Sequence, residues 1–341
     1  LGSMAVRQIL LILFLFGALS GRAARRRAAG SSRNPLAHAA TDGLVANAAA
    51  NGDAAALRGL IDAVGPHIAL FGTVDGSTPL HLAAHNGHEA AVRTMLRALH
   101  PRRALGQLSA ASRGLAANLG RVPLDPFAGF LGHERQILLQ AVDLGGLNAL
   151  HKAAAAGHAP VLRALLGNGA GGGAGATPDW IADVLQESDD CGWTPLHFAS
   201  VNGHGESIRA MLSGVEPRRM LSLLKVLAEE PGTPTWRGTA LEFGVKGGHA
   251  SVVHALLTAV EPGQVLELLY DVDEEEGRTP LFVATMKGHQ ATLGAILDAV
   301  EPGSKARLLQ TTDQQGLTVL HRAQELQRHD VIRLLKEHVL E

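Results

Sequence analysis

The sequence predicts an all-α fold, a solenoid in which helix–turn–helix units stack side by side. The first observation is a recurring motif: Thr194–His204 reads T-P-L-H-F-A-S-V-N-G-H, and Thr78–His88 and Thr279–His289 repeat it closely. Weaker copies begin at Asn148, Thr239 and Thr318. The second observation is composition, because aromatic residues make up only 4% of the chain. Few aromatics, abundant alanine and a repeat in one phase are typical of small-residue packing between stacked helix pairs.

The motif itself predicts the first helix of each unit. Threonine or asparagine stands where a helix N-cap is needed, and its side chain can accept a backbone N–H that the helix leaves unpaired. Pro79, Pro195 and Pro280 follow at the first helical position, where a missing N–H costs nothing. We expect each of these helices to end at a glycine that adopts left-handed φ: Gly87, Gly157, Gly203, Gly248 and Gly288.

The residues after that glycine predict two further helices. An apolar run such as Ser251–Leu257 indicates the second helix. A proline then follows the run in most units, at Pro66, Pro101, Pro178, Pro217, Pro262 and Pro302. Proline continues a helix poorly but starts a new one well, and leucines at helical spacing come after it. We therefore expect a short third helix in the connection between units.

The T-P-L-H…A…G-H string resembles the ankyrin repeat, whose unit is a β-turn followed by two antiparallel helices. The last N-cap positions, Thr239, Thr279 and Thr318, lie 40 and 39 residues apart, whereas an ordinary repeat has about 33. The resemblance implies a divergent array with β-turn fingers and seven or eight units including caps. It also implies that the motif histidines bridge turns and neighbouring units: His81, His88, His151, His158, His197, His204, His249, His289 and His321.

These patterns divide the chain into a leader, 1–40, and one repeat domain, 41–341. We expect an N-terminal cap at 41–74 and a C-terminal cap at 313–341, where Gln327-Arg328-His329 stands in place of Gly-His. Residues 167–176 are a Gly-rich insertion into one repeat. Residues 101–142 form an insert, which is either a decayed repeat or an irregular loop–helix insertion.

The leader has the features of a targeting segment. Arg7 precedes an apolar run over 9–16 that is too short to span a bilayer, and small residues follow it, as in a signal peptide. The next stretch is rich in Arg, Ser and Ala and has no acid before Asp42, which is the composition of a transit peptide. We expect entry into the secretory pathway, with secretion, an organelle lumen or a plastid as destination. The alternatives are a cytoplasmic protein, or a membrane-anchored one that contacts the membrane only through this segment if it is uncleaved.

Composition and motifs give no support for chemistry or for nucleic-acid binding. A net charge of −2 and a pI near 6.8 provide no electrostatic case for nucleic acid. The histidines outside the motif show no zinc-ligand spacing, and no phosphate-binding loop is present, so we expect no metal and no cofactor. Cys191 is the only cysteine, which excludes an internal disulfide. A catalytic role in 101–142, through Asp125, His133 and Glu134, is a remote alternative.

The resemblance therefore implies a non-enzymatic scaffold or adaptor, expected to be a monomer, that binds a protein partner on the concave ankyrin surface. The alternative is an effector or inhibitor that recruits or blocks a target enzyme. The family uses its turn tips and the exposed end of the first helix, which in this chain are Ser77, His85, Asn86, Trp193, Val201, Asn202, Trp236, Arg278, Met286 and Lys287. Trp193 and Trp236 are the strongest candidates because a tryptophan on a turn tip has little core to join. The competing interpretation is that each packs on the adjacent turn.

Overall fold

The computed structural model describes residues 35–71, 76–99, 137–167, 178–230, 233–271 and 278–339. The leader before residue 35, most of the 101–142 insert and nearly all of the Gly-rich insertion lie outside the described residues. The chain divides into two compact units, 1–43 and 44–341, and the repeats belong to the second. Among the described helices, none is both long and apolar enough to cross a membrane.

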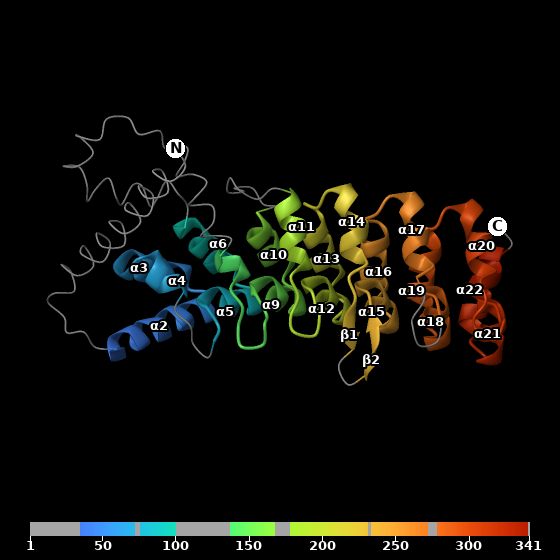
Figure 1. The fold of residues 1–341 in the computed structure, drawn as a ribbon, viewed down its shortest axis with the longest axis horizontal. Helices are drawn as coiled ribbons and strands as arrows, with labels where there is room; N and C mark the ends of the chain where they lie inside the picture. The colour runs from blue at the N-terminus through green and yellow to red at the C-terminus, as the bar shows by residue number, and fades with distance from the viewer. Residues whose placement is uncertain are drawn as a thin grey trace, which may run out of the picture. The chain divides into compact units, whose positions relative to one another are not determined.

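The first helices of the repeats pack side by side (Figure 1), each on the next along the chain. They are α5 (Pro79–His85), α9 (Ala149–Ala155), α12 (Pro195–Val201), α15 (Ala240–Lys246), α18 (Pro280–Lys287) and α21 (Val319–Glu325). Each begins directly after its predicted N-cap, from Thr78 to Thr318, and the predicted glycines have φ between +75° and +79°. Local motif chemistry thus sets both ends of these helices, and the all-α prediction is confirmed.

The second helices form a parallel layer beside the first (Figure 1). They are α6 (Glu89–Ala98), α10 (Ala159–Leu166), α13 (Gly205–Leu212), α16 (Ala250–Leu257), α19 (Gln290–Ala299) and α22 (His329–Val339). The N-terminal end of the domain has α2 (Pro35–Ala50) and α3 (Ala54–Val64), and α3 packs on α6. One continuous apolar core runs between the two layers, from Val45 to Leu335.

The predicted third helix is present in every unit whose connection is described. These helices are α4 (Pro66–Phe71), α11 (Pro178–Gln186), α14 (Pro217–Leu224), α17 (Pro262–Leu269) and α20 (Pro302–Leu309), and each begins at the expected proline. Paired leucines near the helix ends, such as Leu268 and Leu269, are buried in the core. This third helix lengthens each unit, which explains why the repeat is longer than an ordinary ankyrin repeat. Pro101 lies outside the described residues.

The units on either side of the 101–142 insert contact each other directly. Helix α5 packs on α9 and α6 packs on α10. The imidazole of His81 reaches the carbonyl oxygen of Leu147 at 3.0 Å across this boundary. The prediction of a decayed repeat falls mostly on residues outside the described part of the chain, so it stays a prediction.

A β-hairpin replaces the simple turn before α15. Strand β1 (Ala228–Glu230) pairs antiparallel with β2 (Thr233–Gly238), and a bulge lies between Glu229 and Glu230. No motif of the sequence predicted this hairpin. Its physical origin is chain length, because Thr194 and Thr239 are 45 residues apart whereas Thr239 and Thr279 are 40 apart.

The last unit differs from the others on the surface where no further described unit packs. Gln324 and Lys336 are exposed, whereas Thr285 and Leu297, which hold the same positions in the preceding unit, are buried. Polar side chains at these places let a terminal repeat face water. Gln327 takes the place of the helix-ending glycine and keeps a positive φ of 53°.

Candidate partner-binding surface

Three of the turns that precede the first helices, which we call fingers, share an aspartate-centred geometry. In the finger before α9, Asp143 Oδ1 accepts the backbone N–H of Gly145 at 2.9 Å and of Leu147 at 3.1 Å. Asp189 and Asp313 make the same pair of bonds in the fingers before α12 and α21. A short carboxylate that bonds its own following backbone fixes a turn. The fingers are thus rigid supports and not free loops.

A forward row of histidines fastens each of three fingers to the preceding unit. The Nε2 atoms of His81, His151 and His197 lie 3.0, 3.0 and 3.1 Å from the carbonyl oxygens of Leu147, Trp193 and Val226. The backbone N–H of the N-cap residue, such as Thr78 at 3.1 Å, points at Nδ1 of the same ring. Because Nδ1 accepts, the proton resides on Nε2, which donates to the next finger.

Burial keeps these rings neutral. It lowers the pKa of His151 and of His197 to about 4, and it lowers the pKa of His81 as well. Hydrogen bonds to the carbonyl of the next finger act in the opposite direction but are weaker than desolvation. These histidines are therefore structural groups that position the fingers, as the family resemblance implied.

A second row of histidines runs backward and holds the ends of the first helices. Nε2 of His158 lies 3.0 Å from the carbonyl oxygen of His85. Equivalent bonds join His88 to Ala50, His204 to Ala155, His249 to Val201 and His289 to Lys246. In the last unit Arg328 takes the histidine's place and donates to the Met286 carbonyl at 3.1 Å. The backbone of every helix end in this row is thereby pinned to the following unit.

The side chains at those pinned helix ends point outward and form what we call the helix-end row. The predicted residues His85, Asn86, Val201, Asn202 and Lys287 are exposed. Met286 is half-buried. Some of these side chains are already ordered: Asn86 Nδ2 donates to the Ala50 carbonyl at 2.8 Å and Asn202 Nδ2 to the Phe198 carbonyl at 2.9 Å. The structure thus brings this half of the predicted site together in one surface.

The predicted anchor Trp193 lies elsewhere, inside a small second core. Its side chain is only 5% exposed and packs with Ala228, Phe243 and Phe198. Its indole N–H donates to the carbonyl oxygen of Glu229 at 2.6 Å. The expectation that Trp193 has little core to join is wrong, because Ala228 of β1, Phe243 of α15 and Phe198 of α12 supply that core. The competing interpretation, packing on the adjacent turn, is the one the structure supports.

The remaining predicted residues lie in or beside fingers. Trp236 is part of β2, and its side chain lies outside the described part of the structure. Ser77 and Arg278 are half-buried and stand immediately before the N-caps of α5 and α18. They thus lie at the starts of the first helices, whereas the helix-end row lies at the opposite ends.

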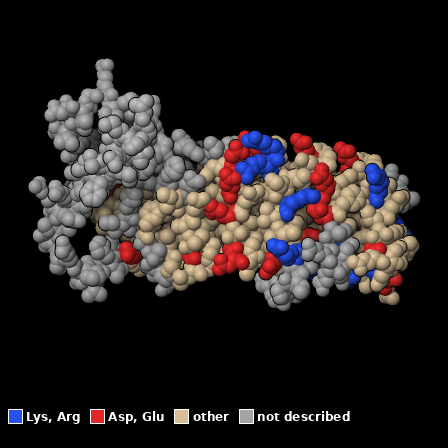
Figure 2. All heavy atoms as spheres, in the orientation of Figure 1, with Lys and Arg blue, Asp and Glu red and all other residues tan. Residues whose placement is uncertain are grey.

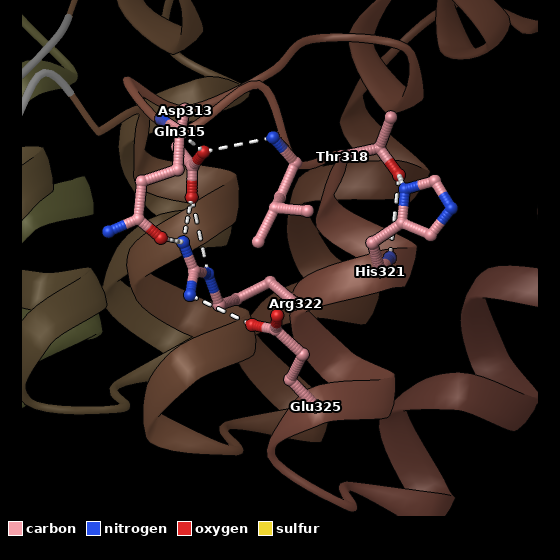
Figure 3. Close-up of polar contacts among 7 residues, drawn as sticks. Asp313, Gln315, Thr318, His321, Arg322 and Glu325 are labelled. Atoms are coloured by element: carbon pink, nitrogen blue, oxygen red, sulfur yellow. Dashed lines mark hydrogen bonds and ion pairs between the residues drawn. The ribbon is translucent and has the colours of Figure 1, made fainter.

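In two fingers the aspartate forms an ion pair with a cation of the following helix, which we call a cation clamp. The sequence motifs did not predict these clamps. Asp313 bonds Arg322, which also donates to Gln315 Oε1 at 2.8 Å and Glu325 Oε2 at 2.9 Å (Figure 3). In the Asn148 unit, Asp143 Oδ2 lies 2.7 Å from Lys152 Nζ. The signal was an aspartate five residues before the N-cap and a cation four residues after it. Hydrogen bonds and the paired cation lower the pKa of both aspartates against the effect of burial.

Comparison with known proteins places this architecture in a family. The model of ankyrin repeats in three copies matches residues 130–220 and 241–340. The model of the single ankyrin repeat matches residues 75–101. Together the matches cover more than half of the chain. The chain belongs to the ankyrin repeat family.

Individual relatives are distant. Human transient receptor potential cation channel subfamily A member 1 is 31% identical over 139 residues, which is 40% of this chain and 11% of the channel. The ankyrin domain of Bcl-3, a member of the IkappaB protein family, is 21% identical, with a TM-score of 0.46, and the match covers 78% of this chain and 87% of that one. The human ASB11 ankyrin domain is 19% identical, with a TM-score of 0.48, and coverage of 86% and 96%.

The fold of this chain is one that generally serves recognition. Ankyrin repeats are generally protein–protein interaction modules, and the ankyrin fold is typically non-catalytic. In the part of the chain that the structure describes, no group of three His, Cys, Asp or Glu side chains could hold a metal ion. Cys191 is exposed in its finger. Asp125, His133 and Glu134, the remote catalytic candidates, lie outside the described residues.

Proposed function

We propose that this ankyrin protein is a scaffold or adaptor that binds a protein partner through its helix-end row and the adjoining fingers. The observation that carries the proposal is the coincidence of the row with the backward histidine bonds. The carbonyl groups of His85 and Val201 accept bonds from histidines of the following units, and that of Met286 accepts the equivalent bond from Arg328. The side chains of these three residues are members of the row. A pre-fixed backbone lowers the entropy that binding must overcome.

The composition of the row fits a protein partner. It combines an aliphatic side chain at Val201, which is 40% exposed, with amides at Asn86 and Asn202 and a cation at Lys287. A moderately apolar centre with polar and charged edges is the usual anatomy of a non-obligate protein interface. The helix-end row is therefore the surface on which we place the partner.

Two charge-changing substitutions test this placement. Affinity capture from source cells provides the partner, and its purified form is then titrated by calorimetry against Val201→Asp and Lys287→Glu. We expect each to weaken binding by about tenfold or more. The matched control is Arg307→Glu on α20, an exposed side chain on a third helix, which should leave affinity unchanged. If the partner binds both row variants normally but binds Arg307→Glu more weakly, the site lies on the third helices instead.

A further inference from the structure

The finger before α12 differs from two of its sisters in one charge. Asp143 has Lys152 and Asp313 has Arg322, and each cation stands four residues after the N-cap. In the finger that contains Asp189, the residue at that position is Phe198. Asp189 uses Oδ1 as its sisters do, accepting the N–H of Cys191 at 3.0 Å and of Trp193 at 2.8 Å. Its Oδ2 has no partner among the described residues.

The surroundings of Asp189 are acidic, and no described cation pairs with these carboxylates. Asp190 is exposed, and neither it nor Asp189 pairs with a described cation. Glu187 bonds only the neutral amides of Gln140 and Asn148, at 2.6 and 3.0 Å. Figure 2 shows acidic side chains at the lower edge, where the fingers lie in Figure 1, and also along the upper edge. A negative potential concentrated on one finger attracts a positive group from outside.

Phe198 adds an aromatic face to this charge. Its ring is half-buried, 5.2 Å between centroids from Trp193 and 5.7 Å from His151 in an edge arrangement. These neighbours hold the ring beneath the finger. A cation gains when it lies over an aromatic face within about 6 Å, and more when it is desolvated. Carboxylate and ring together replace the intramolecular clamp with a place for a cation from elsewhere.

We propose that this finger takes a lysine or arginine side chain of the partner protein, seated between Asp189 Oδ2 and the ring of Phe198. The inference rests on the proposed function. It does not rest on acidic charge alone. Lys152 and Arg322 show that the same carboxylate geometry holds a cation in two other fingers. At those two fingers the chain itself supplies the cation, whereas at the Asp189 finger the partner supplies it.

The first experiment uses N-acetyl-arginine amide as the probe and the full chain. We expect a saturable shift of the Trp193 indole N–H signal by NMR, since this ring borders both Phe198 and the Asp189 turn. Asp189→Asn keeps the turn acceptor but removes the charge, and it should abolish the shift. Phe198→Lys should also abolish it by restoring an internal clamp. Phe198→Leu, which copies Leu82 of the Thr78 unit, is the folding control and should only weaken it.

The second experiment separates this inference from the proposed function. The captured partner should bind Asp189→Asn and Phe198→Lys about tenfold or more weakly. Normal binding to both, with loss at Val201→Asp, would overturn the inference and leave the proposed function intact. Normal binding to all three would contradict the proposed surface as well. A shift of the indole signal that persists in Asp189→Asn, or no shift in the wild type, overturns the inference without any partner.

Discussion

The Nε2 atom of His151 donates to the carbonyl oxygen of Trp193 at 3.0 Å, across the boundary between two units. His158 of the same unit bonds in the opposite direction, to the carbonyl of His85, also at 3.0 Å. One unit is thus fastened forward through its first helix and backward through its second. Because the forward donor must keep a neutral ring with an acceptor at Nδ1, protonation of His151 would break the cap on Asn148 N–H.

We predict a loss of stability between about pH 6.5 and pH 4 that follows from the forward histidines. Their pKa is lowered to about 4 at His151 and His197 in the folded protein, from 6.5 in the unfolded chain. The unfolded chain therefore binds protons that the folded chain does not bind. The free energy of unfolding consequently decreases as the pH is lowered. Below pH 4 the loss is on the order of 3 kcal/mol for each ring. Urea unfolding at pH 7, 5.5 and 4.5 measures it.

The carboxylates with a lowered pKa act only at the acid end of this window and below it, since that of Glu206 starts from 4.5. The lowered pKa values of Asp143 and Asp313 start from 3.8, so their contribution is lost only at lower pH. His151→Gln should remove about half of the pH dependence that the two rings produce. A free energy of unfolding that is constant from pH 7 to pH 4.5 would show that the forward histidines do not behave as buried neutral groups.

The helix ends could be predicted from sequence because their causes are local. A cap such as Thr78, a proline after it and a glycine with φ of +78° at Gly87 each act within a few residues. The surroundings of Trp193 could not be predicted in that way, since its hydrogen-bond partner Glu229 lies 36 residues away on a hairpin. The direct packing of α5 on α9 across the long insert was hidden for the same reason.

The candidate site likewise has a part that could be predicted from the sequence and a part that could not. The exposure of Val201 and Asn202 follows from their place after the buried positions of one short helix, which a repeat motif specifies. The cation clamps depend on pairs such as Asp313 and Arg322, nine residues apart, whose meeting requires the finger geometry. The charge difference at Asp189 becomes visible only when the fingers are compared in three dimensions.

A buried hydroxyl in the Thr279 unit offers a stabilising substitution. Thr292 is fully buried, and its Oγ1 has no hydrogen-bond partner. Val252 holds the same position in the preceding unit and is also fully buried. We expect Thr292→Val to raise the free energy of unfolding by about 1 kcal/mol, because it removes an unpaired polar atom at nearly constant volume. Denaturant titration measures the change.

The control for that substitution is another threonine in the same layer. Thr94 Oγ1 donates to the Ala90 carbonyl at 2.9 Å. Thr94→Val should therefore bring no gain, since the hydroxyl it removes is satisfied. Equal gains from Thr94→Val and Thr292→Val would mean that the missing hydrogen bond is not the cause.

The last unit carries a backbone strain that glycine should relieve. Gln327 has φ of 53°, where the other units have glycine, such as Gly203 with φ of 78°. Left-handed backbone costs a residue with a side chain about 1 kcal/mol relative to glycine. We expect Gln327→Gly to stabilise the protein by about that amount, visible as slower hydrogen exchange in α21 and α22. Gly203→Ala should destabilise it, because the new Cβ would lie 2.7 Å from the His249 ring.

Trp193 should behave as a structural residue in mutagenesis. Its ring lies 4.7 Å between centroids from Phe243, and its indole N–H bonds the β1 backbone. We expect Trp193→Ala to cost about 3–5 kcal/mol of stability and Trp193→Phe, which retains the packing but not the N–H, about 1–2 kcal/mol. Hydrogen exchange at Ala228–Glu230 should quicken in both. Because either loss of stability would weaken partner binding indirectly, only variants such as Val201→Asp report on the surface itself. If Trp193→Ala instead kept its stability and its protection from hydrogen exchange, the ring would again be a candidate contact residue.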